Sequence, residues 1–122
     1  MNRKFCLTLW TVVIVGTVPA SAAWDRAWMK NLNSDVVAQF EIALRRGETK
    51  AKNCFQLLQM PKRGAVRMSV VVDGNRGRIT EAAVQAPYAD SIVENCLKRG
   101  FIGEIVSPFD GPPRKVMVTF DP

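Results

Sequence analysis

Residues 65–85 read AVRMSVVVDGNRGRITEAAVQ, and this stretch decides the fold class. Its first half carries an apolar side chain at every second position: Val66, Met68, Val70 and Val72. That period is typical of a strand with one buried face. The glycine-containing run 74–77 follows between two strand-like stretches, where it favours a hairpin turn. We therefore predict two antiparallel strands, over residues 65–73 and 78–85.

The second of these strands has an irregular pattern. Ile79 and Val84 are its large apolar residues, but they stand an odd number of positions apart. In a regular strand, residues of opposite parity point to opposite faces of the sheet. Either a β-bulge brings both side chains to the core, or Ile79 faces outward.

Helical spacing precedes the hairpin. Apolar side chains recur at i, i+3, i+4 and i+7 over residues 35–59, with an interruption at Gly47. Arg45 and Arg46 stand just before this glycine, as cations often do at a helix C-terminus. The pattern predicts one kinked helix or two consecutive helices, ending before Pro61.

Two more elements follow the hairpin. A short helix is predicted to begin at Asp90 or Ser91 and to end around Gly100. Its apolar side is formed by Ile92, Val93, Cys96 and Leu97. Residues 115–121 alternate again and predict a third strand. The order helix, strand, strand, helix, strand indicates a small α+β fold, a three-stranded antiparallel sheet with helices on one face.

Residues 1–22 have the parts of a cleavable secretory signal peptide. A positively charged start and an apolar run over residues 5–15 precede Ala20 and Ala22, which give the A-x-A pattern of a cleavage site. A bilayer span needs about twenty apolar residues, so this run is short for an anchor. We predict cleavage after Ala22 and a periplasmic protein without a stable membrane anchor. Release from the cell, and retention of the segment as an anchor, stay open as alternatives.

Export also determines how the cysteines are interpreted. Cys6 leaves with the signal peptide, while Cys54 and Cys96 remain. Two cysteines in an oxidising compartment favour a structural disulfide. Because they fall on the two predicted helices, the bond would clamp one helix to the other. If export fails, the alternative is a pair of buried free thiols.

Composition limits the classes of function. The sequence has no histidine, which removes the commonest general base and the imidazole metal ligand. Loss of the signal peptide leaves 15 basic and 11 acidic residues, a net charge of +4. These charges are scattered and lack the interleaved aromatic residues of a nucleic-acid surface. We predict a protein that is not an enzyme, with no cofactor, no metal and no nucleic-acid partner.

A lead-in segment, residues 23–33, separates the signal peptide from the domain at 34–122. It contains Trp24 and Trp28, spaced as neighbours on one helix face. Two interpretations stay open. The segment is either a short helix packed on the domain or an exposed patch that docks a partner.

Several short motifs between residues 36 and 120 occur in a characteristic order. They are Asn53-Cys54-Phe55, Met60-Pro61, Gly64-Ala65-Val66-Arg67-Met68, Gly77-Arg78-Ile79, Val93-x-x-Cys96 and Val116-x-Val118-x-Phe120. In order and spacing they resemble the C-terminal domain of TonB-type energy transducers, in its disulfide-bearing branch, the AgmX/PglI C-terminal domain. Two features depart from the family. Residues 104–108 lack its usual aromatic residue, and no anchor with a proline-rich linker precedes the domain, so we expect a free-standing module.

The resemblance implies a protein-binding or adaptor module for an envelope protein. In this family a partner segment pairs with the edge of the sheet, a form of β-augmentation. The edge here would be the last strand, with Lys115, Met117 and Thr119 pointing outward as candidate binding residues. A lysine on an edge strand is equally typical of a guard against unwanted pairing. The alternative function is a structural subunit of an envelope secretion or motility assembly, docked through Trp24 and Trp28.

Overall fold

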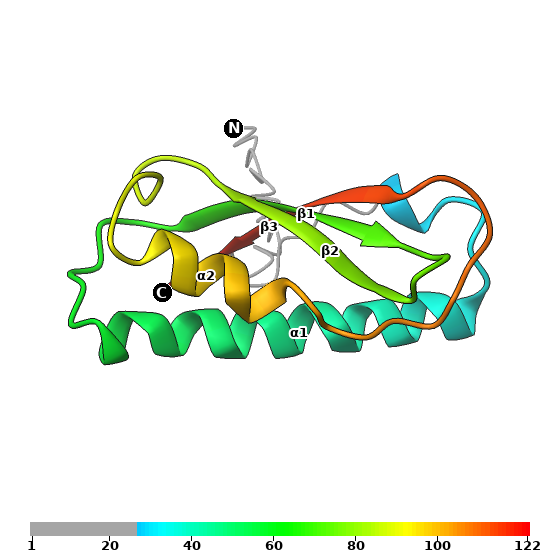
Figure 1. The fold of residues 1–122 in the computed structure, drawn as a ribbon, viewed down its shortest axis with the longest axis horizontal. Helices are drawn as coiled ribbons and strands as arrows, with labels where there is room; N and C mark the ends of the chain where they lie inside the picture. Colours follow the sequence, from blue (N-terminus) through cyan, green and yellow to red (C-terminus); the bar gives the residue numbers. More distant parts are fainter. Residues whose placement is uncertain (1–26) are drawn as a thin grey trace, which may run out of the picture.

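The computed structural model describes residues 27–122 and has the predicted α+β fold (Figure 1). The predictions for the signal peptide and for Trp24 lie outside the described residues. The elements are the 3-10 helix η2 (Ala27–Met29), α1 (Ser34–Leu57), β1 (Val66–Asp73), β2 (Arg78–Val84), α2 (Glu94–Phe101) and β3 (Arg114–Phe120). The strands form one antiparallel sheet in the order β2-β1-β3. Both helices lie on the same side of this sheet.

Helix α1 is a single helix of 24 residues. The Asn33 side chain caps its start by accepting a hydrogen bond from the Val36 amide at 2.9 Å. Gly47 does not end the helix, so of our two alternatives the single helix is confirmed and the pair of consecutive helices is wrong. A Cβ atom at Gly47 would overlap the ring of Phe101 on α2. The glycine is therefore explained by the close approach of the two helices.

The hairpin of β1 and β2 contains the bulge that the sequence pattern allowed. Val71 stands opposite Glu81, but its neighbour Val72 stands opposite Ile79, which leaves Thr80 as the extra residue. Ile79 and Val84 are both buried. The bulge is confirmed, and the alternative of an outward-facing Ile79 is wrong.

Helix α2 begins later and ends later than we predicted. It starts at Glu94, and Gly100 lies inside it. A Cβ atom at Gly100 would lie 3.1 Å from the Ala51 amide nitrogen of α1. The chain leaves the helix after Phe101, and Gly103 adopts a φ of +92°. Gly100 is thus a helix-contact glycine, and Gly103 provides the left-handed residue that often follows a helix end.

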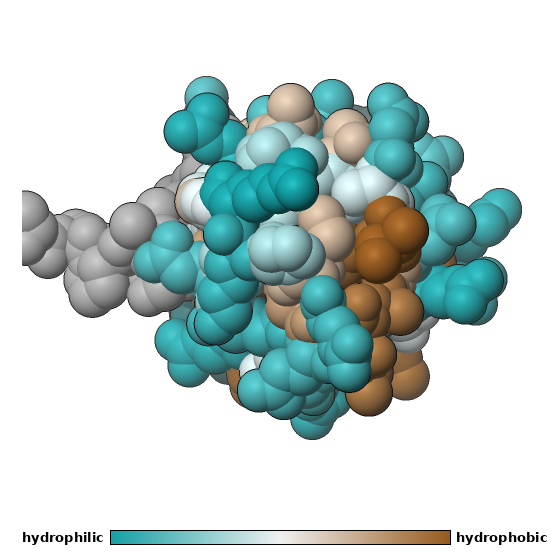
Figure 2. Space-filling model, turned by 90° about the vertical axis from the view of Figure 1, so that its left-hand side faces the viewer, coloured by the Kyte–Doolittle hydropathy of each residue, from teal (hydrophilic) through white to brown (hydrophobic). Residues whose placement is uncertain are grey.

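Three large apolar side chains are exposed at one end of the helix layer. They are Leu57 (77% exposed), Leu58 (39%) and Ile92 (69%). Leu57 and Leu58 lie three and four residues after Cys54, and Ile92 lies four residues before Cys96. Because the disulfide joins these cysteines, the three side chains belong to the same end of the molecule. Figure 2, viewed from that end, shows hydrophobic side chains gathered in one area. We call Leu57, Leu58 and Ile92 the apolar patch. It corrects our prediction for Ile92, which does not share the buried side of Val93 and Leu97.

Candidate functional site

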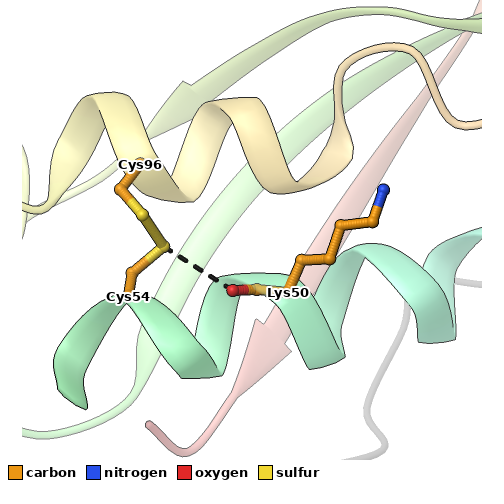
Figure 3. Close-up of a disulfide and its surroundings, with 3 residues drawn as sticks. All are labelled: Lys50, Cys54 and Cys96. Atoms are coloured by element: carbon orange, nitrogen blue, oxygen red, sulfur yellow. Dashed lines mark hydrogen bonds between the residues drawn. A yellow bond between two sulfur atoms is a disulfide. The ribbon is translucent and has the colours of Figure 1, made fainter. Parts of the chain in front are cut away.

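A disulfide joins Cys54 of α1 to Cys96 of α2, as predicted (Figure 3). The two Cα atoms are 5.9 Å apart. Cys54 is buried and its sulfur also contacts the Lys50 carbonyl oxygen at 3.6 Å. Within residues 27–122 no group of three or more potential ligands could hold a metal ion. The geometry is that of a staple between the helices.

A second link between the helix layer and the rest of the chain lies beside this staple. The Lys50 ammonium forms an ion pair with Glu104, whose carboxylate is almost fully buried. Glu104 belongs to the segment that leaves α2. A buried carboxylate without a partner would be costly, so this ion pair holds residues 103–106 in place.

Trp28 is a core residue and not a docking residue. It is only 4% exposed, and its ring stacks on Phe40 of α1 with centroids 3.9 Å apart. Of our two interpretations, packing on the domain is confirmed for Trp28, and the exposed patch is wrong for it.

The backbone of β3 has a free side. The Gln85 amide donates to the Arg67 carbonyl at 2.9 Å, so Arg67 directs its backbone groups toward β2. In an antiparallel sheet both groups of a residue point to one neighbour, and the direction alternates along the strand. The even-numbered residues of β1 therefore bond to β3, where they stand opposite the even-numbered positions 114–120. The odd-numbered residues of β3 must direct their backbone groups away from the sheet.

These outward residues are Lys115, Met117 and Thr119, the three that the sequence singled out. Their N–H and C=O groups face away from β1, and no strand of the described chain pairs with them. Lys115 is exposed, and Met117 and Thr119 are half-buried. Their side chains lie on the face of the sheet opposite the helices, since Val116, Val118 and Phe120 fill the core. The structure thus brings all three together on one accessible edge.

The other edge of the sheet is obstructed at its start. Residues 103–106 run along the start of β2, where Gly103 N–H donates to the Ile79 carbonyl and Ile79 N–H donates to the Glu104 carbonyl, both at 2.9 Å. The bulge at Thr80 also distorts this edge. Covering segments and bulges are two ways in which proteins block strand addition. Of the two edges of the described sheet, β3 is therefore the one with neither a bulge nor a covering segment paired to it.

Sequence reasoning missed the covering role of residues 103–106 and the apolar patch. Both depend on which segments meet in space. The sequence pattern gave residues 101–110 no regular structure, and the isolated bridge between Arg78 and Ile105 has no local signal.

Among the described residues, no helix combines the length and the apolar character needed to cross a membrane. Comparison of the chain with protein-family models, with curated proteins and with solved structures finds no match in any of the three.

Proposed function

We propose that this protein is an exported, non-enzymatic module that binds an extended segment of an envelope protein at the free edge of β3. The proposal joins two lines of support. One is the resemblance of its motifs to the C-terminal domain of TonB-type transducers. The other, which carries the proposal, is the row of outward backbone groups on Lys115, Met117 and Thr119, while the opposite edge of the sheet carries a bulge and is covered at its start.

The energetics of this site favour weak and reversible binding. Each backbone hydrogen bond contributes roughly 0.5–1.5 kcal/mol net of its exchange with water. Three outward residues offer about six groups, while association costs at least about 4 kcal/mol in lost freedom. Main-chain pairing alone then gives only a small favourable free energy of binding. A specific partner must add side-chain contacts on the open face of the sheet.

Proline at position 117 tests the proposal. The probe is an acetylated, amidated nine-residue peptide of threonine and serine with a central leucine, titrated into the isotope-labelled protein at up to about millimolar concentration. Met117→Pro removes one outward donor, and its ring obstructs the incoming strand. We expect peptide affinity, followed by amide shifts along β3, to fall at least about tenfold.

The controls use the same substitution elsewhere. Thr119→Pro changes the same edge and should match Met117→Pro. Ala82→Pro changes the β2 edge, beyond its covered start, and should leave peptide affinity unchanged if binding is at β3. The amide spectrum of each variant must retain the dispersion of the folded protein. Equal binding by wild type and folded Met117→Pro, or no shift of β3 amides at millimolar peptide, contradicts the proposal.

The alternative is a structural subunit of an envelope assembly. Burial of Trp28 removes one of its two candidate docking residues, but the apolar patch favours it independently. In that case Ile92→Asp would disrupt association with the neighbouring subunit, and Met117→Pro would not. The exposed Ile105, at 75% exposure away from the patch, provides the matched control through Ile105→Asp.

A further inference from the structure

Within residues 27–122, Lys115 has no ion-pair partner at the free edge. Its side chain is exposed, and its cross-strand neighbour on β1 is Val71. The ion pairs Lys50–Glu104, Lys52–Glu48 and Arg76–Asp73 of the described residues do not include Lys115. The ammonium group therefore faces solvent at a position where an added strand would place a side chain.

The nearest carboxylates on this face of the sheet are unavailable to Lys115. Asp73, its diagonal neighbour on β1, accepts hydrogen bonds from the Asn75 amide at 3.0 Å and the Arg76 amide at 3.4 Å. It also pairs with the Arg76 guanidinium at 3.7 Å. Glu81 stands opposite Val71 on the far side of β1, about two strand spacings, or roughly 9.5 Å, from Lys115.

Along β3, the outward side chains change from cationic at Lys115 to apolar at Met117 and polar at Thr119. Met117 stands beside Ser69, and Thr119 stands beside the exposed Arg67. Asp121 follows β3 in sequence and adds a negative charge at that end, which offsets the charge of Arg67. The excess positive charge therefore lies at the Lys115 end, and the flexible thioether of Met117 adjoins it.

We propose that Lys115 selects the partner instead of excluding it. The added strand carries a carboxylate in register with Lys115 and an apolar side chain two residues away, in register with Met117. The partner is then an extended acidic segment with one apolar side chain on the same face. This inference rests on the proposed function, because it names the chemistry recognised at the same edge.

Cross-strand geometry supports this pairing. Directly opposed side chains in neighbouring strands have Cβ atoms about 4.5–5.5 Å apart, within reach of an ion pair. An added strand would also cover one side of Lys115 and so reduce solvent screening around it. A guard lysine acts in the opposite way, because strand addition would desolvate a charge that gains no partner.

The test compares three peptides that differ at one position. Each is the threonine–serine peptide with a central leucine, and it carries glutamate, glutamine or lysine two positions from the leucine. The substitution is made on either side of the leucine, so that parallel and antiparallel strands are both sampled. Of the two glutamate peptides, we take the one that wild type binds more tightly. At low salt we expect wild type to bind it about fivefold more tightly than the peptide with lysine at the same position. The preference should shrink as salt screens the pair.

Variants at position 115 separate selection from guarding. Lys115→Glu should reverse the preference, and Lys115→Thr should remove it by weakening binding of the glutamate peptide. If Lys115 is a guard, Lys115→Thr binds all three peptides more tightly, and the inference is wrong. Lys98→Glu makes the same charge change on α2, outside the sheet, and should leave the peptide order unchanged.

Met117→Pro distinguishes this inference from the function on which it rests. If Met117→Pro weakens all three peptides equally while wild type does not discriminate among them, strand addition stands and selection by Lys115 is wrong. If folded Met117→Pro binds every peptide as wild type does, the proposed function itself fails.

Discussion

Loss of the Cys54–Cys96 disulfide is expected to lower the free energy of unfolding by about 4 kcal/mol. The two cysteines are 42 residues apart in sequence, and closing a loop of that length removes unfolded-chain entropy worth about this amount at room temperature. A domain of this size has a total stability of about 5–15 kcal/mol. The disulfide therefore supplies a large share of the free energy of unfolding. Urea unfolding of wild type and of the Cys54→Ala/Cys96→Ala double variant measures the difference.

A reduced wild-type sample provides the control for this prediction. Cys54 is buried, so alanine leaves a small gap in addition to removing the bond. Reduction with a thiol reagent opens the bond without changing the side chains. Both forms should lose comparable stability. If the reduced and oxidised proteins unfold at the same urea concentration, the staple is not a major source of stability.

Gly47→Ala is expected to destabilise the protein by about 2 kcal/mol, although alanine is the better helix former. In an exposed helix interior, this change gains up to about 1 kcal/mol. Here the added methyl group would overlap the Phe101 ring, which is fully buried and cannot swing into solvent. Overpacking of a core typically costs about 1–3 kcal/mol, which exceeds the gain in helix propensity. Helix propensity predicts that Gly47→Ala stabilises the protein, whereas overpacking predicts that it destabilises it. Thermal or urea unfolding therefore decides between the two effects.

A second substitution tests whether Phe101 is the cause. Phe101→Leu removes the ring atoms that a Cβ at Gly47 would meet. In the Phe101→Leu background, Gly47→Ala should cost much less than in wild type, which gives a coupling energy of about 1 kcal/mol or more. If Gly47→Ala stabilises wild type, the glycine interrupts the helix pattern for a local reason, as the sequence alone indicated.

The fold class could be predicted because its signals are periodic and local. Val66, Met68, Val70 and Val72 alternate on one strand, and all four are buried in the core. The parity conflict between Ile79 and Val84 predicted a bulge because it involves only neighbouring positions in one strand. The order of elements then determined which segments could form the sheet.

The two helix glycines could not be interpreted in the same way. Gly47 follows two arginines and Gly100 follows Lys98 and Arg99, so each has the local surroundings of a helix end. Their real constraint is the partner helix: Phe101 lies 54 residues from Gly47 in sequence and packs against it. The sequence alone does not distinguish a glycine required for close helix packing from one required for a left-handed backbone conformation.

The candidate site was predicted only in part. Alternation placed Lys115, Met117 and Thr119 on one face of the last strand, and the structure places them there. Whether that strand has a free edge depends on residues 103–106, which cover β2 through long-range backbone hydrogen bonds. For Trp28, the interpretation as an exposed docking residue was wrong. Its spacing from Trp24 carries no information about Phe40, on which its ring stacks.

Hydrogen exchange of the β3 amides tests the central claim, a free edge that takes up a strand, most directly. In the free protein, the Val116 and Val118 amides should exchange slowly because they bond to β1, while the Met117 and Thr119 amides should exchange at least about tenfold faster. Saturation with the leucine-centred peptide should slow Met117 and Thr119 and leave Val116 and Val118 unchanged. A Met117 amide that is already protected in the free protein, or that stays fast when the peptide is bound, would contradict the account.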